Sequence, residues 1–145
     1  MPITVQVKGL SELVSSLGGF KSKLDEAAAY ATAQAGLAFE AQAKRNFQGV
    51  HRRVDGHWEP GEHIHGAPDF PNVRTGNLRR SIFTEMRQGF GTYSVSVGPS
   101  MVYARAVELG RGGQGYPYMR PAYDKVKPQV TDIFVRAVKR RLSNG

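Results

Sequence analysis

Hydrophobic positions change their spacing after the first residues of the chain. Aliphatic and polar residues alternate between Ile3 and Val7, which predicts a half-buried strand over about residues 3–8. From Phe20 onward the apolar residues recur at helical spacing, and most of them are Ala. Because Ala has the highest helix propensity, we predict a long helix over about residues 20–47. Its small side chains would let another backbone approach closely.

The second half of the chain predicts a hairpin and a last helix. Apolar residues alternate with polar ones over residues 80–88 and 92–98, and the Gly-Phe-Gly sequence at 89–91 favours a turn between them. A helical period over about residues 121–142 predicts a C-terminal helix, in which Pro128 produces either a kink or a late start. The predicted fold is therefore α+β, with a small antiparallel sheet packed against the Ala-rich helix and the C-terminal helix.

Between residues 48 and 73 the hydrophobic residues follow neither the spacing of a strand nor that of a helix. This segment holds four Gly, three Pro, the only Trp and all four His. Loops of this length are usually functional or disordered. We therefore predict a long extended loop with space for a short hairpin over residues 58–64. We expect the loop to become ordered only on assembly, when binding offsets the entropy cost of ordering it.

Composition limits the chain to one basic domain. Its 145 residues suit a single domain over residues 1–145. Twenty Lys and Arg against twelve Asp and Glu give a net charge of +8, which favours contact with a polyanion or an acidic protein face, although solubility alone could also require it. The absence of Cys excludes disulfides and thiolate metal sites. With no signal sequence and no membrane-length apolar run, we expect assembly in a cytoplasm.

Candidates for catalysis are few. Four His lie within 15 residues and have acids beside them, and zinc accepts such ligands, but their spacing matches no metal-binding motif. They are His51, His57, His63 and His65. The sequence assembles no nucleophile with a base, no cluster of acids for magnesium and no phosphate-binding loop. We predict that the chain is not an enzyme and has no catalytic residue, metal ligand or cofactor.

Two islands of sequence are more informative. The first runs from Arg74 to Ile82 and reads Arg-Thr-Gly-Asn-Leu-Arg-Arg-Ser-Ile, in which Thr-Gly permits a tight turn and three Arg surround the entry to the hairpin. The second contains Val-Gly at 97–98, Tyr-Ala at 103–104, Val-Glu-Leu-Gly at 107–110 and Pro-Tyr-Met-Arg-Pro-Ala at 117–122.

Glu108 is the acid of the second island. It stands in an otherwise apolar segment, residues 103–109, which we predict to be a short helix or irregular. An acid in such surroundings usually needs a partner, and Arg74 or Arg120 is the simplest candidate. Guanidinium groups suit carboxylates, phosphates and backbone carbonyls at subunit joints. We expect the Arg island and Glu108 to serve assembly more than folding.

The ordered set of motifs resembles the neck, or tail-completion, proteins of long-tailed bacteriophages. The resemblance extends from about Val5 to about Leu142. It implies a structural virion protein that forms a ring at the head–tail junction, around the channel that DNA crosses, with six copies expected and twelve possible. The implied partners are further copies of the chain, the adjoining head-connector and tail-terminator or tail-tube proteins, and genomic DNA, with no membrane. In such rings an exposed sheet edge and a long loop can dock on the next subunit.

The resemblance and the charges together suggest two sets of site residues. The candidate subunit-interface residues are Arg74, Thr75, Gly76, Asn77, Arg79, Arg80, Tyr103, Glu108 and Arg120. The candidate DNA-channel residues are Arg52, Arg53, Arg136, Lys139, Arg140 and Arg141. Two other functions stay open: a sequence-independent nucleic-acid-binding protein that uses the basic charge, and, less favoured, a small metal-dependent hydrolase built on the His-rich loop.

Overall fold

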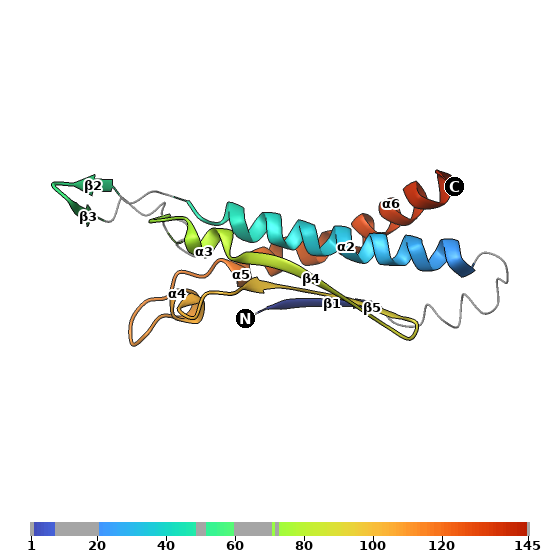
Figure 1. Cartoon of the computed structure of the whole chain (residues 1–145), viewed down its shortest axis with the longest axis horizontal. Helices are drawn as coiled ribbons and strands as arrows, with labels where there is room; N and C mark the ends of the chain where they lie inside the picture. The colour runs from blue at the N-terminus through green and yellow to red at the C-terminus, as the bar shows by residue number, and fades with distance from the viewer. Residues whose placement is uncertain (1, 8–20, 49–51, 60–70, 72, 145) are drawn as a thin grey trace.

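The computed structural model of the chain describes residues 2–7, 21–48, 52–59, 71 and 73–144. Figure 1 shows a long helix lying along a small sheet, with a further helix beside it. The elements are β1 (Ile3–Val7), α2 (Lys21–Arg45), β2 (Arg52–Val54), β3 (His57–Glu59), α3 (Asn77–Arg80), β4 (Ile82–Gly89), β5 (Thr92–Pro99), α4 (Ala104–Leu109), α5 (Met119–Val126), a 3₁₀ turn (Lys127–Gln129) and α6 (Val130–Ser143).

The main sheet has three antiparallel strands in the order β1-β5-β4. Val5 lies opposite Val95 on one side of β5, and Met86 lies opposite Val95 on the other. Because side chains alternate across a strand, these residues share one face of the sheet. The predicted α+β class and the three predicted strands are confirmed. Strands β1 and β4 are the two edges of this sheet.

Helix α2 covers the apolar face of the sheet through a stripe of very small residues (Figure 1). The long Ala-rich helix predicted from the sequence is confirmed. An ideal Cβ atom built on Gly36 would lie 2.4 Å from Cγ2 of Val95 and 2.8 Å from Cγ2 of Thr84. The helix therefore approaches β5 and β4 so closely that a hydrogen is the only side chain with room. The buried stripe consists of Ala27, Ala28, Ala31, Thr32, Ala35, Phe39 and Ala43.

The predicted C-terminal helix is interrupted at its proline. Pro128 lies in the 3₁₀ turn that separates α5 from α6. It cannot donate a backbone N–H, and its ring clashes with the preceding turn of an α-helix. Helix α6 packs along α2, with Ala137 buried between them. The guanidinium carbon of Arg141 lies 5.2 Å from the centre of the Tyr30 ring on α2.

One predicted boundary is wrong. The second strand was expected to begin at about residue 80, but Asn77–Arg80 forms a turn of helix and β4 begins at Ile82. Strands β2 and β3 form a short hairpin with Asp55-Gly56 at its turn. Residues 60–64 of the hairpin expected over 58–64 lie outside the described residues. Both turn residues have positive φ, 47° and 82°, as a tight two-residue hairpin turn requires. Most of the predicted loop, at residues 49–51, 60–70 and 72, lies outside the described residues.

We expect Gly36→Ala to destabilise the fold although Ala is the better helix former. The gain in helix propensity is about 1 kcal/mol, whereas overfilling a packed core costs about 1–3 kcal/mol. Chemical denaturation should therefore show a net loss of stability. Gly113→Ala is the control, because a Cβ atom there meets nothing within 4 Å. Equal midpoints for the two variants would contradict the close approach of α2 to the sheet.

Candidate functional site

The Arg74–Ile82 island folds into a tight turn that one of its own arginines holds. Gly76 has a φ of 78°, a left-handed conformation that favours glycine. Nη2 of Arg80 donates to the carbonyl oxygen of Thr75 at 3.2 Å and to Oδ1 of Asn77 at 2.7 Å. The Arg80 side chain is thus engaged within the turn, whereas the Arg79 side chain is exposed.

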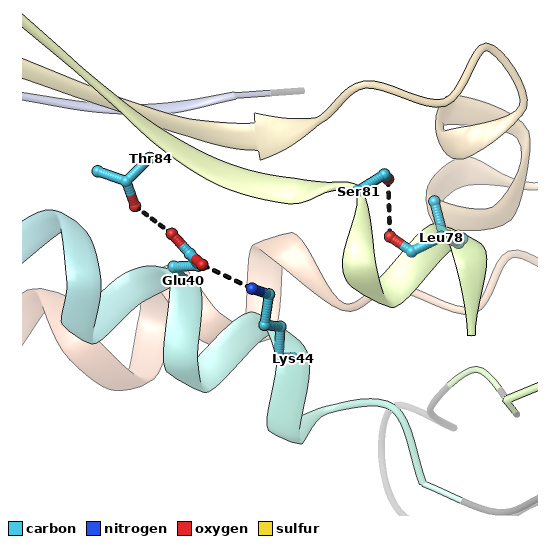
Figure 2. A network of polar contacts seen from close by, with 5 residues as sticks. All are labelled: Glu40, Lys44, Leu78, Ser81 and Thr84. Carbon is cyan, nitrogen blue, oxygen red and sulfur yellow. Dashed lines mark hydrogen bonds and ion pairs between the residues drawn. The ribbon is translucent and has the colours of Figure 1, made fainter.

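Polar contacts join strand β4, which follows this turn, to the long helix (Figure 2). Oγ1 of Thr84 on β4 donates to Oε2 of Glu40 on α2 at 2.6 Å, and Nζ of Lys44 lies 2.6 Å from Oε1. Burial raises the pKa of Glu40, but the hydrogen bonds from Lys44 and Thr84 and the Lys44 charge outweigh it, so its pKa is lowered. Oγ of Ser81 donates to the Leu78 carbonyl at 2.7 Å and closes the helical turn.

The island and the second motif meet in a cleft of about 520 Å³ at the end of α2. Its apolar lining comes from Phe47, Pro71, Val73, Leu78 and Val107. Six of the nine predicted interface residues lie around it, and none of the described acids does. They are Arg74, Thr75, Gly76, Asn77, Arg79 and Tyr103. The structure therefore brings together residues from two distant parts of the sequence, although it does not test whether they contact another subunit.

Glu108 lies under this surface and is only 7% exposed. Its Oε2 accepts hydrogen bonds from the backbone N–H groups of Tyr118 at 2.8 Å and Met119 at 3.0 Å. Its Oε1 accepts a third from the N–H of Arg120 at 2.9 Å. A helix leaves its first N–H groups unsatisfied, so the carboxylate caps α5 from α4. This contact makes Glu108 part of the monomer's own scaffold; its role at a subunit joint stays a prediction.

The expectation that the Arg120 guanidinium pairs with Glu108 is wrong. Nε of Arg120 lies 3.2 Å from Asp124, one turn along α5, and its guanidinium lies 5.8 Å from the centre of the Tyr123 ring. Main-chain donors satisfy a buried carboxylate as well as a cation does and need no second charge. Arg120 is exposed and lies outside the cleft lining.

A second buried network, which no sequence pattern predicted, joins the residues just after α2 to the start of α5. Nδ2 of Asn46 donates to the Tyr118 carbonyl at 2.8 Å, and Nε2 of Gln42 donates to Oδ1 of Asn46 at 2.9 Å. The rings of Phe47 and Tyr118 lie 4.8 Å apart. Burial raises the pKa of Tyr118, and the Glu108 carboxylate adds to the shift. Asn46 and Tyr118 therefore position the floor of the cleft.

The candidate DNA-channel residues form two separate groups. Arg136 and Arg140 line a shallow hollow between α2 and α6. Lys139 is exposed on the same helix. Arg52 and Arg53 belong to β2, at the opposite end of the molecule (Figure 1). One subunit therefore does not carry these cations as one continuous patch.

The described part of the chain contains no group of three His, Asp or Glu side chains arranged to hold a metal ion. His51, His63 and His65 lie outside it. None of the described helices is both long enough and apolar enough to cross a membrane.

The outer face of α4 is a feature that the sequence reading missed. Val102, Tyr103 and Leu109 are 98%, 44% and 57% exposed, although Ala104 and Glu108 on the inner face are buried. The sequence does indicate this apolar face, because positions 102, 106 and 109 follow a helical spacing and are all apolar. We had predicted residues 103–109 to be a short helix or irregular, and the helix is confirmed.

We expect Glu108→Ala to destabilise the monomer by at least about 3 kcal/mol, because it strands N–H groups that formed hydrogen bonds to a charged acceptor. Glu108→Gln keeps one acceptor oxygen and should lose about half as much. Thermal denaturation measures both. Glu85→Ala is the control, since the Glu85 side chain is 50% exposed and its ion pair is weak. A melting curve unchanged by Glu108→Ala would show that the cap contributes nothing to folding.

Comparison with known proteins gives one family. Nothing among curated proteins or solved structures matches the chain at a significant level. A family model described as "Bacteriophage HK97-gp10, putative tail-component" matches residues 11–110, which is more than half of the chain. The match contains the whole Arg74–Ile82 island and the Val-Glu-Leu-Gly motif. The chain therefore belongs to the HK97-gp10-like family of bacteriophage tail components, which are structural proteins of the virion.

Proposed function

We propose that the chain forms a closed ring at the head–tail junction of the phage, around the channel that DNA crosses. The observation that carries the proposal is the cleft at the end of α2, where exposed Arg79 and Tyr103 surround an apolar floor. Phe47 and Val107 supply part of that floor. A surface of this kind suits a subunit joint, because an apolar centre gives affinity and a charged rim sets the register.

The geometry of the sheet supports a head-to-tail arrangement of copies. Strands β1 and β4 are the edges of the described sheet, and such edges present N–H and C=O groups that can pair with another chain. When one surface of a subunit binds a different surface of the next, repetition gives a ring wherever the rotation closes. The family resemblance favours six copies, with twelve as the next expectation. The adjoining partners would be the head connector on one side and a tail-terminator or tail-tube protein on the other.

The cations of α6 suit contact with DNA in the channel. Arg136, Lys139 and Arg140 project from one helix with a single acid, Asp132, on its first turn. Cations that neutralise phosphates release counterions, and the resulting affinity does not depend on sequence. The same observation supports the second candidate, a sequence-independent nucleic-acid-binding protein that acts without a ring. We propose no enzymatic activity for the chain in either case.

The ring is tested by Arg79→Glu. Because the Arg79 side chain is exposed, the variant should melt as the parent does, while reversal of a charge at each joint should abolish rings and the joining of heads to tails. Native mass spectrometry and negative-stain images of the purified protein, alone and mixed with tails, measure the assembly. Lys125→Glu is the matched control, since it makes the same charge change on an exposed face of α5. A parent protein that stays monomeric under all these conditions would refute the ring.

Contact with DNA is tested by reversing two α6 cations in Arg136→Glu/Arg140→Glu. Each lost phosphate contact lowers the slope of log affinity against log salt by about 0.9, so the pair should lower it by about 2. Fluorescence anisotropy with a short duplex over a salt series gives the slope. Lys125→Glu/Lys127→Glu reverses two exposed cations outside α6 and should change it less. Equal slopes for the two pairs would mean that α6 does not face DNA.

A further inference from the structure

The outer face of α4 has the character of a docking surface that has no cover within the described chain. Val102, Tyr103 and Leu109 are side by side on a second cleft of about 530 Å³, which also has Arg105 and Arg111 in its lining. Tyr103 lies on this cleft and on the cleft at the end of α2, so the two form one continuous surface. Contiguous exposed apolar side chains of this kind usually mark a binding site.

This surface is held in place before anything binds. Glu108 anchors the inner side of α4 to α5 through three hydrogen bonds. The loop after α4 folds back on itself, and the N–H of Tyr116 donates to the carbonyl of Val107 at 2.7 Å. A Cβ atom on Gly110 would lie 2.3 Å from the oxygen of Gly113, so that crossing requires glycine. A rigid surface loses little entropy on binding.

The charge of the surface selects the chemistry of its partner. Among the residues that the structure describes, no acid lines either cleft. Arg79, Arg105 and Arg111 are exposed, and within the described ranges none of the three has an acid in ion-pair contact. Exposed apolar groups ringed by unpaired cations fit a segment that carries acids together with large apolar side chains.

The same chain contains such a segment. Residues 54–73 include four acids and no Lys or Arg, together with Trp58 and other large apolar residues. Its first residues, 54–59, belong to the β2–β3 hairpin, whose β2 strand also contains Arg52 and Arg53. Asp55 is exposed at the turn of this hairpin. Two strands of three residues are at best marginally stable by themselves, so this hairpin needs a surface to pack on.

The β2–β3 hairpin does not lie on the α4 face of its own subunit in the observed arrangement. In Figure 1 the hairpin extends beyond the end of α2, on the helix side of the molecule, whereas α4 lies on the sheet side. The two are well separated in this view and are therefore separated in space. We propose that the β2–β3 hairpin of one copy, with the acidic segment that follows it, docks on the α4 face of a second copy. The proposal rests on the proposed ring and names the two surfaces that meet at each joint.

Site-directed disulfide formation tests this pairing directly, because the chain has no cysteine of its own. Asp55→Cys and Leu109→Cys are made as separate full-length variants, mixed and oxidised. Thiols that the joint brings together have an effective concentration near the millimolar range, so the mixed disulfide should form at least about tenfold faster than in a mixture without docking. Asp55→Cys with Val135→Cys is the control, since Val135 is 42% exposed on α6. Equal rates for the two mixtures would overturn the proposal.

Charge exchange gives a second, independent measurement. Arg105→Glu/Arg111→Glu should weaken assembly by about tenfold or more, and adding Asp55→Arg/Glu59→Arg to the same chain should restore it. If rings form but neither the cross-link nor the rescue appears, the hairpin does not dock on α4, and the proposed ring still stands. If heads and tails fail to join while rings remain intact, the α4 face binds another virion protein, and the proposed occupant is wrong. If no oligomer forms at all, the ring and this inference fail together.

Discussion

The closeness of α2 to the sheet sets the dimensions of the rest of the molecule. At Gly36 there is no room for even one methyl group between the helix and Val95. The three-stranded sheet is too small to enclose a core by itself, and a helix lined with Ala brings backbone to backbone over a long distance. Because α2 lies so near, Phe39 stacks on Tyr123 of α5, and Phe47, just after α2, contacts Tyr118 just before α5. The cleft is therefore placed where α2 ends and the larger side chains begin.

Glu108 divides the short helix α4 into two faces with different tasks. Its carboxylate turns inward and satisfies three N–H groups at the start of α5. The face that remains outside carries Val102, Leu109 and cations, and no described residue in the cleft linings is an acid that could neutralise them. The Glu108 carboxylate, whose charge could have balanced these cations, is thus buried in the interior. The same residue fixes the helix and leaves its outer side basic.

Periodic patterns were sufficient to predict most of the fold, and contacts with the main chain explain what they missed. The Ala stripe and the alternating strands depend on side-chain spacing, which a sequence displays directly. The partner of Glu108 was not predictable in this way, because the donors are backbone N–H groups that every residue has. The turn of the β2–β3 hairpin was predictable from Asp55-Gly56, a pair that favours such turns. The residues that follow are also rich in Gly and Pro and offer competing turn positions. Asn46 lies near a helix end, where polar residues are common, so its burial could not be read from the sequence.

A surface of one sign also constrains how copies of the chain can associate. Two copies that met through the same α4 face would bring Arg79, Arg105 and Arg111 against their equivalents, and like charges at a joint cost several kcal/mol. A two-fold dimer through this face is therefore disfavoured by charge alone. Contact with a different, acidic surface has no such cost, and repetition of a contact between unlike surfaces gives a ring rather than a pair. The basic outer face of α4 would thus favour a closed ring because it disfavours the two-fold dimer, which is the simplest alternative to a ring.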